Sequence, residues 1–232
     1  MAKIVPSLIS LQGTLYDVTH VNSKSYPAHT RAVRGTYKRA ICNSVLEQNS
    51  MLTSLLNKAA KPVHDALKQL AGPFKQRDLW QQLLSRMRSA SSPTLSGLYR
   101  TLESLEINKA YPLGRRVPVP QVVVRSDKEG LILNMTAIGH PVFGKKVKAE
   151  QYCYELFVLW MNKDGQLCGI EHTGTEWIQL SAPVPICEFW IDHPTDGQYY
   201  ILCLKLQAGQ AEKEVESFAG MGMRIVGTGL WG

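Results

Sequence analysis

Residues 152–171 read YCYELFVLWMNKDGQLCGIE, and this stretch decides the fold class. Over residues 152–161 large apolar side chains occupy every second position, which predicts a strand with one face buried in a core. Asp164-Gly165 then supplies the positive backbone φ that a tight hairpin turn needs, and residues 167–171 read as the returning strand. The side chains expected on the buried face are Tyr152, Tyr154, Leu156, Val158 and Trp160.

Short strand patterns continue on both sides of this hairpin, and turn-forming residues separate them. They lie at residues 121–125, 131–138, 177–180, 186–191, 199–206 and 223–228. Many short strands in succession are typical of a β-sandwich, which we expect over residues 121–232. The aromatic face of the hairpin is then core, and the alternative is an exposed, sugar-binding platform.

Apolar residues recur at helical spacing from residue 39 to residue 106, which predicts a small domain of three or four helices. Pro62 is expected in the first turn of a second helix, where proline is tolerated. Asp78 is the expected N-cap of a third helix, and Ser92-Pro93 is expected to open a fourth.

Proline marks the joint between the helical and the strand patterns. Residues 107–120 contain three prolines and an arginine pair, and we interpret them as an extended linker. Residues 1–38 show little periodicity, which indicates an extended arm with one short strand at residues 13–21. The predicted class is α+β: a basic arm, a helical domain, and then a β-sandwich.

The strand region also resembles a known kind of domain. Trp160 ends a long central strand, and residues 193–206 read HPTDGQYYILCLKL, which resembles the tyrosine corner of immunoglobulin and fibronectin type III domains. The resemblance spans roughly residues 119–230 and implies an immunoglobulin- or fibronectin-like sandwich. The whole layout also resembles uncharacterised small proteins of bacteria and their prophages, which implies a place in a phage-like or mobile-element particle.

Charge is divided unevenly along the chain, whose net charge is +7. Residues 1–118 hold 17 Lys and Arg against 6 Asp and Glu, whereas residues 119–232 hold 9 against 13. A basic half next to an acidic half favours an anionic partner for the basic half, or contact with the opposite half of another copy.

The arm carries the candidate anion- or nucleic-acid-binding residues, which are Lys24, Arg31, Arg34, Lys38 and Arg39. Phosphate contacts, docking on a protein and a merely solvated face are three readings that the residues leave open. Arg31, Arg34 and Lys38 would share one face if this piece is helical. No helix-turn-helix, zinc-finger or RNA-binding signature is present.

Catalytic and metal-binding signatures are missing from the sequence. The five cysteines form no CxxC pair, and their odd number indicates reduced thiols rather than an immunoglobulin-type disulfide. His64-Asp65, Glu171-His172 and Asp192-His193 are adjacent pairs, whose side chains we expect to point apart. The glycine patterns near the C-terminus do not open a helix, so no nucleotide site is expected. We predict no enzyme activity, cofactor, metal or small-molecule substrate.

The N-terminal MAKIVPSLISLQG is too short and interrupted for a signal peptide, and no apolar run is long enough to cross a membrane. We therefore expect a cytoplasmic or virion location and no membrane contact. The hypothesis is an interaction or assembly protein, whose arm docks on an anionic partner and whose sandwich contacts another protein or a second copy. The alternative is a nucleic-acid-binding protein without sequence preference.

Overall fold

The computed structural model describes residues 44–72, 78–117, 121–126, 130–136, 139–192, 197–211, 213–215 and 217–231, and the backbone of three short strands nearer the N-terminus. The chain forms two compact units, Met1–Gln48 and Asn49–Gly232. The second unit combines helices with antiparallel sheets, so the predicted α+β class is confirmed.

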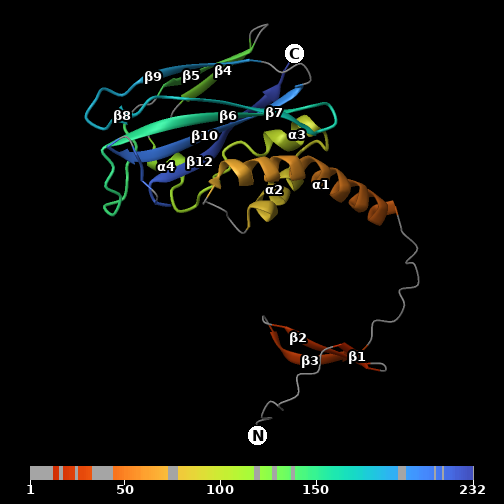
Figure 1. Cartoon of the computed structure of the whole chain (residues 1–232). Helices are drawn as coiled ribbons and strands as arrows, with labels where there is room; N and C mark the ends of the chain where they lie inside the picture. Colours follow the sequence, from red (N-terminus) through yellow and green to blue (C-terminus); the bar gives the residue numbers. More distant parts are fainter. Residues whose placement is uncertain are drawn as a thin grey trace, which may run out of the picture. The chain divides into compact units, whose positions relative to one another are not determined.

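The central layer of the second unit is a large antiparallel sheet (Figure 1). Its two longest strands, β6 (Gln151–Met161) and β10 (Tyr199–Gln210), pair over most of their length. The strands β7 (Leu167–Gly174) and β8 (Ile178–Gln179) pair with β6, while β11 (Lys213–Glu214) and β12 (Met221–Leu230) pair with β10. The predicted hairpin is confirmed: Gly165 has a φ of 76° and its N–H donates to Asn162 O at 3.0 Å.

A smaller sheet covers one face of this layer. Its order is β4-β5-β9, with β4 at Gln121–Ser126, β5 at Gly130–Thr136 and β9 at Ile186–Asp192. Leu131, Leu133 and Phe189 of the small sheet share one apolar cluster with Tyr154 and Trp160 of the large sheet. The strand layers are therefore sandwich-like. The aromatic platform is wrong as an interpretation, because Tyr152, Tyr154 and Trp160 are all 0% exposed.

Helices cover the opposite face of the large sheet (Figure 1). They are α1 (Ser44–Leu70), α2 (Leu79–Arg88) and α3 (Leu95–Arg100). Leu67 and Leu83 from the helices share a cluster with Leu159 and Cys203 from the sheet. Because the large sheet is buried on both faces, its central strands read as nearly continuous apolar runs. Among the described residues, no helix is long and apolar enough to cross a membrane.

The predicted break at Pro62 is wrong, since Pro62 lies inside the single helix α1. A proline there removes one backbone hydrogen bond and costs about 3 kcal/mol in an isolated helix. The buried face of α1 offsets that cost, because its apolar stripe continues through the proline on the same side. The buried residues of this stripe are Leu56, Ala59, Ala60, Val63, Ala66 and Leu67.

The two predicted helix caps have different outcomes. Asp78 lies at the N-cap of α2 as predicted, but its side chain accepts no backbone N–H and forms an ion pair with Lys109 instead. Thr94, rather than Ser92-Pro93, caps α3, because Thr94 Oγ1 accepts a hydrogen bond from Gly97 N at 3.2 Å. Ser and Thr both belong to the preferred N-cap residues, so composition alone does not choose between them.

The first unit contains a three-stranded antiparallel sheet of order β1-β2-β3. Its strands are β1 (Gly13–Leu15), β2 (Val18–Ser23) and β3 (Tyr26–Ala32). The single strand predicted over residues 13–21 is therefore divided into β1 and β2, which pair with each other. Leu15 pairs with Val18, so the chain reverses direction within the segment that was expected to be one strand.

Candidate anion-binding surface

The structure places only one of the predicted arm residues. Arg31 lies in β3, where its backbone is opposite Thr19 of β2, so the condition for a shared helical face is not met at Arg31. Lys24, Arg34, Lys38 and Arg39 lie outside the described residues. Anion binding by the arm stays a prediction.

A second group of cations comes from two segments that lie far apart in the sequence. Arg115 and Arg116 end the short helix α4 (Leu113–Arg116), and three lysines follow in the loop between β5 and β6. All five residues are exposed. We call this group the basic surface, and its members are Arg115, Arg116, Lys145, Lys146 and Lys148.

The carboxylate of Glu106 fixes the N-terminal turn of α4. It accepts hydrogen bonds from Leu113 N at 2.9 Å and from Gly114 N at 2.8 Å. These are N–H groups of the first turn, which have no partner within a helix. Glu106 Oε1 also lies 3.7 Å from Arg224 Nε of β12, so the anchor ties α4 to the large sheet.

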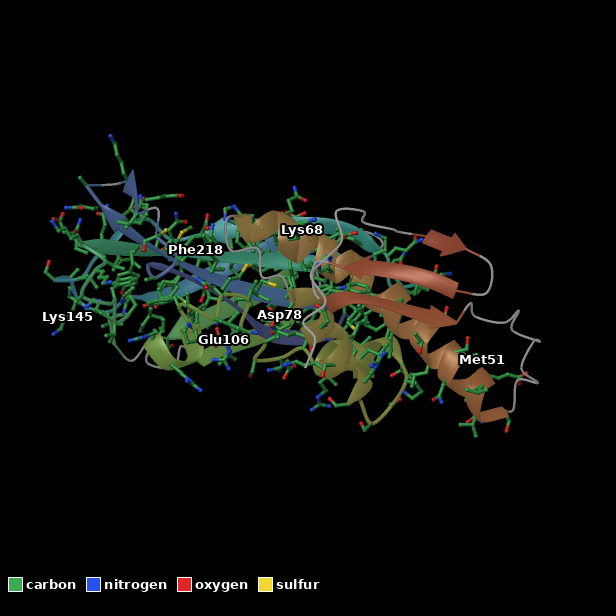
Figure 2. The ribbon with its side chains drawn as sticks, turned by 90° about the horizontal axis from the view of Figure 1, so that it is seen from below. Met51, Lys68, Asp78, Glu106, Lys145 and Phe218 are labelled. Atoms are coloured by element: carbon green, nitrogen blue, oxygen red, sulfur yellow. The ribbon has the colours of Figure 1, made fainter. Side chains whose placement is uncertain are left out.

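Direct contacts join α4 to the lysine loop. Val142 N donates to Arg116 O at 2.9 Å, and the rings of Tyr111 and Phe143 stack with centroids 5.6 Å apart. Val147 is 8% exposed and anchors the far side of the loop, which leaves Lys145 and Lys146 on the outside. Figure 2 shows Lys145 at one end of the unit and Glu106 nearer its middle.

The charge of the basic surface is not neutralised locally. None of the salt bridges among the described residues involves any of its five cations. The nearby carboxylate of Glu106 already binds two amides and Arg224, and Glu150 accepts a hydrogen bond from Gln210 Nε2 at 3.4 Å. A cluster of uncompensated cations attracts anions and releases counterions when it binds them.

The aromatic side chain of this region serves packing rather than recognition. Tyr111 is 2% exposed, and its hydroxyl donates to Val142 O at 3.2 Å. Burial raises the pKa of Tyr111 well above its usual range. The ring therefore orients the loop and cannot stack on a nucleic-acid base.

The signals for the basic surface were present in the sequence but separate. The arginine pair lies in the segment interpreted as a linker, and residues 144–148, GKKVK, taken alone favour a solvated loop over an anion contact. Sequence reasoning did not join them, because the contact between residues 116 and 142 depends on tertiary structure. The aromatic residues Tyr111 and Phe143 beside the two clusters were the one usable hint.

Two hollows lie away from the basic surface. The larger is about 520 Å³ in volume and is lined by the β6–β7 turn, Cys168 and Gln198. The smaller is about 220 Å³ and lies beside Arg100 and Glu103, where Glu103 Oε1 accepts a hydrogen bond from the Thr228 hydroxyl at 3.0 Å. Neither lining contains a histidine in the part of the chain that the structure describes, so neither holds a histidine-activated nucleophile.

His64, His140 and His172 each pack against one aromatic ring. His64 lies against Trp80 with ring centroids 5.3 Å apart, and its Nδ1 is 3.2 Å from Asp65 Oδ1. The expectation that His64 and Asp65 point apart is therefore wrong, since the exposed carboxylate bends back toward the ring. His172 stacks on Phe157 and lies 3.5 Å from Glu155, not beside Glu171.

The described cysteines, Cys153, Cys168, Cys187 and Cys203, are free thiols. Cys153 and Cys203 lie in neighbouring strands but out of register, since they oppose Gln207 and Phe157 respectively. Burial raises the pKa of both thiols to about 12, which leaves them protonated at neutral pH and poorly nucleophilic. Within the described ranges, no three His, Cys, Asp or Glu side chains are grouped closely enough to hold a metal ion.

No family model matches the chain, and no curated protein matches it at a significant level.

Proposed function

We propose that this chain is a non-catalytic interaction and assembly protein that docks on an anionic partner. The observation that carries the proposal is the basic surface, because none of the salt bridges in the described part of the chain involves its five exposed cations. The predicted arm residues Lys24, Arg31, Arg34, Lys38 and Arg39 would contribute further positive charge. A place in a phage-like or mobile-element particle belongs to the same proposal and rests on the likeness of overall layout alone.

The β-layers would act as the rigid support for this binding. Two packed antiparallel sheets are the arrangement by which immunoglobulin and fibronectin type III domains present contact surfaces. The helices cover the other face of the large sheet, and Leu113 of α4 and Phe143 of the lysine loop pack in the cluster between the two sheets. Such a support needs no reaction chemistry, since binding function lies in the site rather than in the fold.

Nucleic-acid binding without sequence preference is the second candidate. Unpaired Arg and Lys side chains on two adjacent segments fit a chain of phosphates, whose charges are closely and regularly spaced. Because Tyr111 is buried, its ring is not available to stack on single-stranded bases. This candidate therefore expects contacts to the backbone of a duplex, with little discrimination between sequences.

Fluorescence anisotropy with the full chain tests both candidates. The probes are a labelled DNA duplex and labelled poly-glutamate, each at about 50 mM and about 200 mM salt. We expect binding at low salt that weakens steeply at high salt. Neutralising the basic surface with Arg115→Gln, Arg116→Gln, Lys145→Gln, Lys146→Gln and Lys148→Gln should weaken binding at least tenfold and flatten the salt dependence, on the order of one unit of slope per lost contact.

A matched control comes from α1, whose outward side carries the exposed lysines Lys58, Lys61 and Lys68. Replacing these three by Gln should change affinity less than twofold. Binding of poly-glutamate without DNA would remove the nucleic-acid candidate. Binding of neither polymer at low salt would contradict both candidates, as would equal losses in the two variants.

A further inference from the structure

The outer face of the small sheet exposes three large apolar side chains. In β9 exposure alternates strictly, so that Cys187, Phe189 and Ile191 face the core while Ile186 and Trp190 face outward. Ile186 is 78% exposed and Trp190 is 46% exposed. Val123 of β4 adds a third large apolar side chain at 47% exposure.

Pairing between the strands aligns these side chains in rows across the sheet. One row is Arg125, Ile132 and Trp190, and the next is Val123, Asn134 and Glu188. Trp190 is held in a fixed orientation, because its Nε1 donates to Asp192 Oδ1 at 2.9 Å. Large, oriented tryptophans in an apolar setting are the side chains that most often dominate a protein interface.

Charge is distributed unequally over this face. Arg125 lies on the β4 edge, whereas Glu188 and Asp192 flank Trp190 on the β9 edge. A two-fold axis that lies between two such faces and runs along the strands places the β4 edge of one copy over the β9 edge of the other. Arg125 then meets the Trp190 ring between two carboxylates of the second copy, and the reverse contact forms at the same time.

We propose that the outer face of the β4-β5-β9 sheet is a self-association surface, which pairs with the same face of a second copy of this chain. The two symmetry-related contacts combine a cation–π interaction with charge pairing, and Ile132 packs near the axis against its counterpart. The inference goes beyond the proposed function, because the basic surface lies on other elements and can bind an anion with or without a dimer.

The size of the face sets the strength of the association. Three strands about 4.8 Å apart and about seven residues long cover roughly 300 Å² per copy. Stable complexes bury about 1,200 Å² or more in total, so this dimer is weak and rapidly exchanging. On a long anionic partner, neighbouring bound copies would be concentrated together, and a weak contact would then make binding cooperative.

Sedimentation velocity of the full chain over a wide concentration range tests the surface. We expect a reversible monomer–dimer equilibrium that shifts toward dimer at high micromolar concentration. Arg125→Glu alone and Glu188→Arg alone should each shift it at least fivefold toward monomer, because each homodimer then contains two like-charge contacts. A mixture of the two variants should restore association, since the heterodimer contains one native and one reversed pair.

Two further variants distinguish this surface from others. Trp190→Ala should weaken the dimer, whereas Leu52→Glu on the exposed part of α1 should leave it unchanged. Melting temperatures within a few degrees of the parent identify variants that remain folded. A chain that stays monomeric at the highest concentration, a dimer lost only with Leu52→Glu, or no rescue in the charge-swap mixture would each overturn the inference. Anion binding, measured separately, is expected in all of these variants.

Discussion

Gly222 of β12 lies directly beneath the segment that leads into α4. A Cβ atom at this position would lie 2.6 Å from Leu113 Cδ2 and 2.8 Å from Tyr111 O. Only glycine allows so close an approach, because no other residue lacks the Cβ. The close contact sets the height of α4 above the sheet, and therefore the position of Arg115 and Arg116 on the surface.

Gly222→Ala should lower the free energy of unfolding by about 1–3 kcal/mol, because the added methyl group overlaps both backbone and side-chain atoms. Urea denaturation followed by tryptophan fluorescence measures the change. The control is Gly169→Ala in β7, where an added Cβ meets no atom within 4 Å. Equal effects of the two substitutions would show that the contact with Leu113 and Tyr111 carries no strain.

At the scale of elements, α1 changes environment along its length. Residues 44–54 are exposed, while Leu56 and Leu67 further along are 1% and 0% exposed. Leu52 belongs to the same apolar stripe as Leu56 but retains 38% exposure. The helix therefore draws its stability from its second part, which packs on the sheet.

Leu56→Ala and Leu52→Ala, one helical turn apart, should differ sharply in stability. Leu56→Ala leaves a cavity in the core and should cost about 2–5 kcal/mol, whereas Leu52→Ala should cost about 1 kcal/mol or less. Urea denaturation of each variant provides both values. A loss at Leu52 as large as that at Leu56 would mean that the exposed part of α1 is covered in solution.

The long strands of the second unit were predictable from the sequence to within a few residues, because alternation and turn residues are local signals, whereas β3 and β11 were not predicted. β6 and β9 are examples, at Gln151–Met161 and Ile186–Asp192. Pro62 was misread because the rule for proline is also local, whereas the burial that keeps α1 continuous is tertiary. The basic surface was not predictable for the same reason: it depends on the hydrogen bond between Val142 and Arg116.

At the scale of the whole molecule, the division of charge along the sequence does not match its division in space. Lys145, Lys146 and Lys148 belong to the net acidic half of the chain, yet they join Arg115 and Arg116 from the basic half. The two halves are also not separate in the core, since helix and strand residues share one apolar cluster. The positive charge is therefore concentrated on a surface that α4 and the lysine loop form together, and not on one half of the sequence.

The buried thiols and tyrosines of the two apolar clusters also predict how stability depends on alkaline pH. Burial raises the pKa of the Cys203 thiol to about 12 and those of Tyr99 and Tyr154 well above their usual range. Unfolded cysteine and tyrosine ionise near pH 9 and 10, so above about pH 8 the unfolded state loses protons that the folded state retains. The stability that these groups contribute is thus complete below about pH 8 and is lost as pH rises, by about 1.4 kcal/mol per pH unit for each group once the pH exceeds the unfolded pKa of that group.

Tyr99 and Cys203 lie in the cluster between the helices and the large sheet, and Tyr154 lies in the cluster between the two sheets. Because their ionisation requires these clusters to open, we expect tyrosine ionisation and loss of structure to coincide. Tyrosinate absorbance and far-ultraviolet circular dichroism, recorded together from pH 8 to pH 12, should show one cooperative transition for the buried rings. Tyr99→Phe removes one such group and only a long hydrogen bond of 3.5 Å to Gly165 O, so it should move the transition to higher pH with little effect at pH 7. Buried tyrosines that titrate near pH 10 in a still folded chain would contradict this prediction, because their ionisation would then not require the apolar clusters to open.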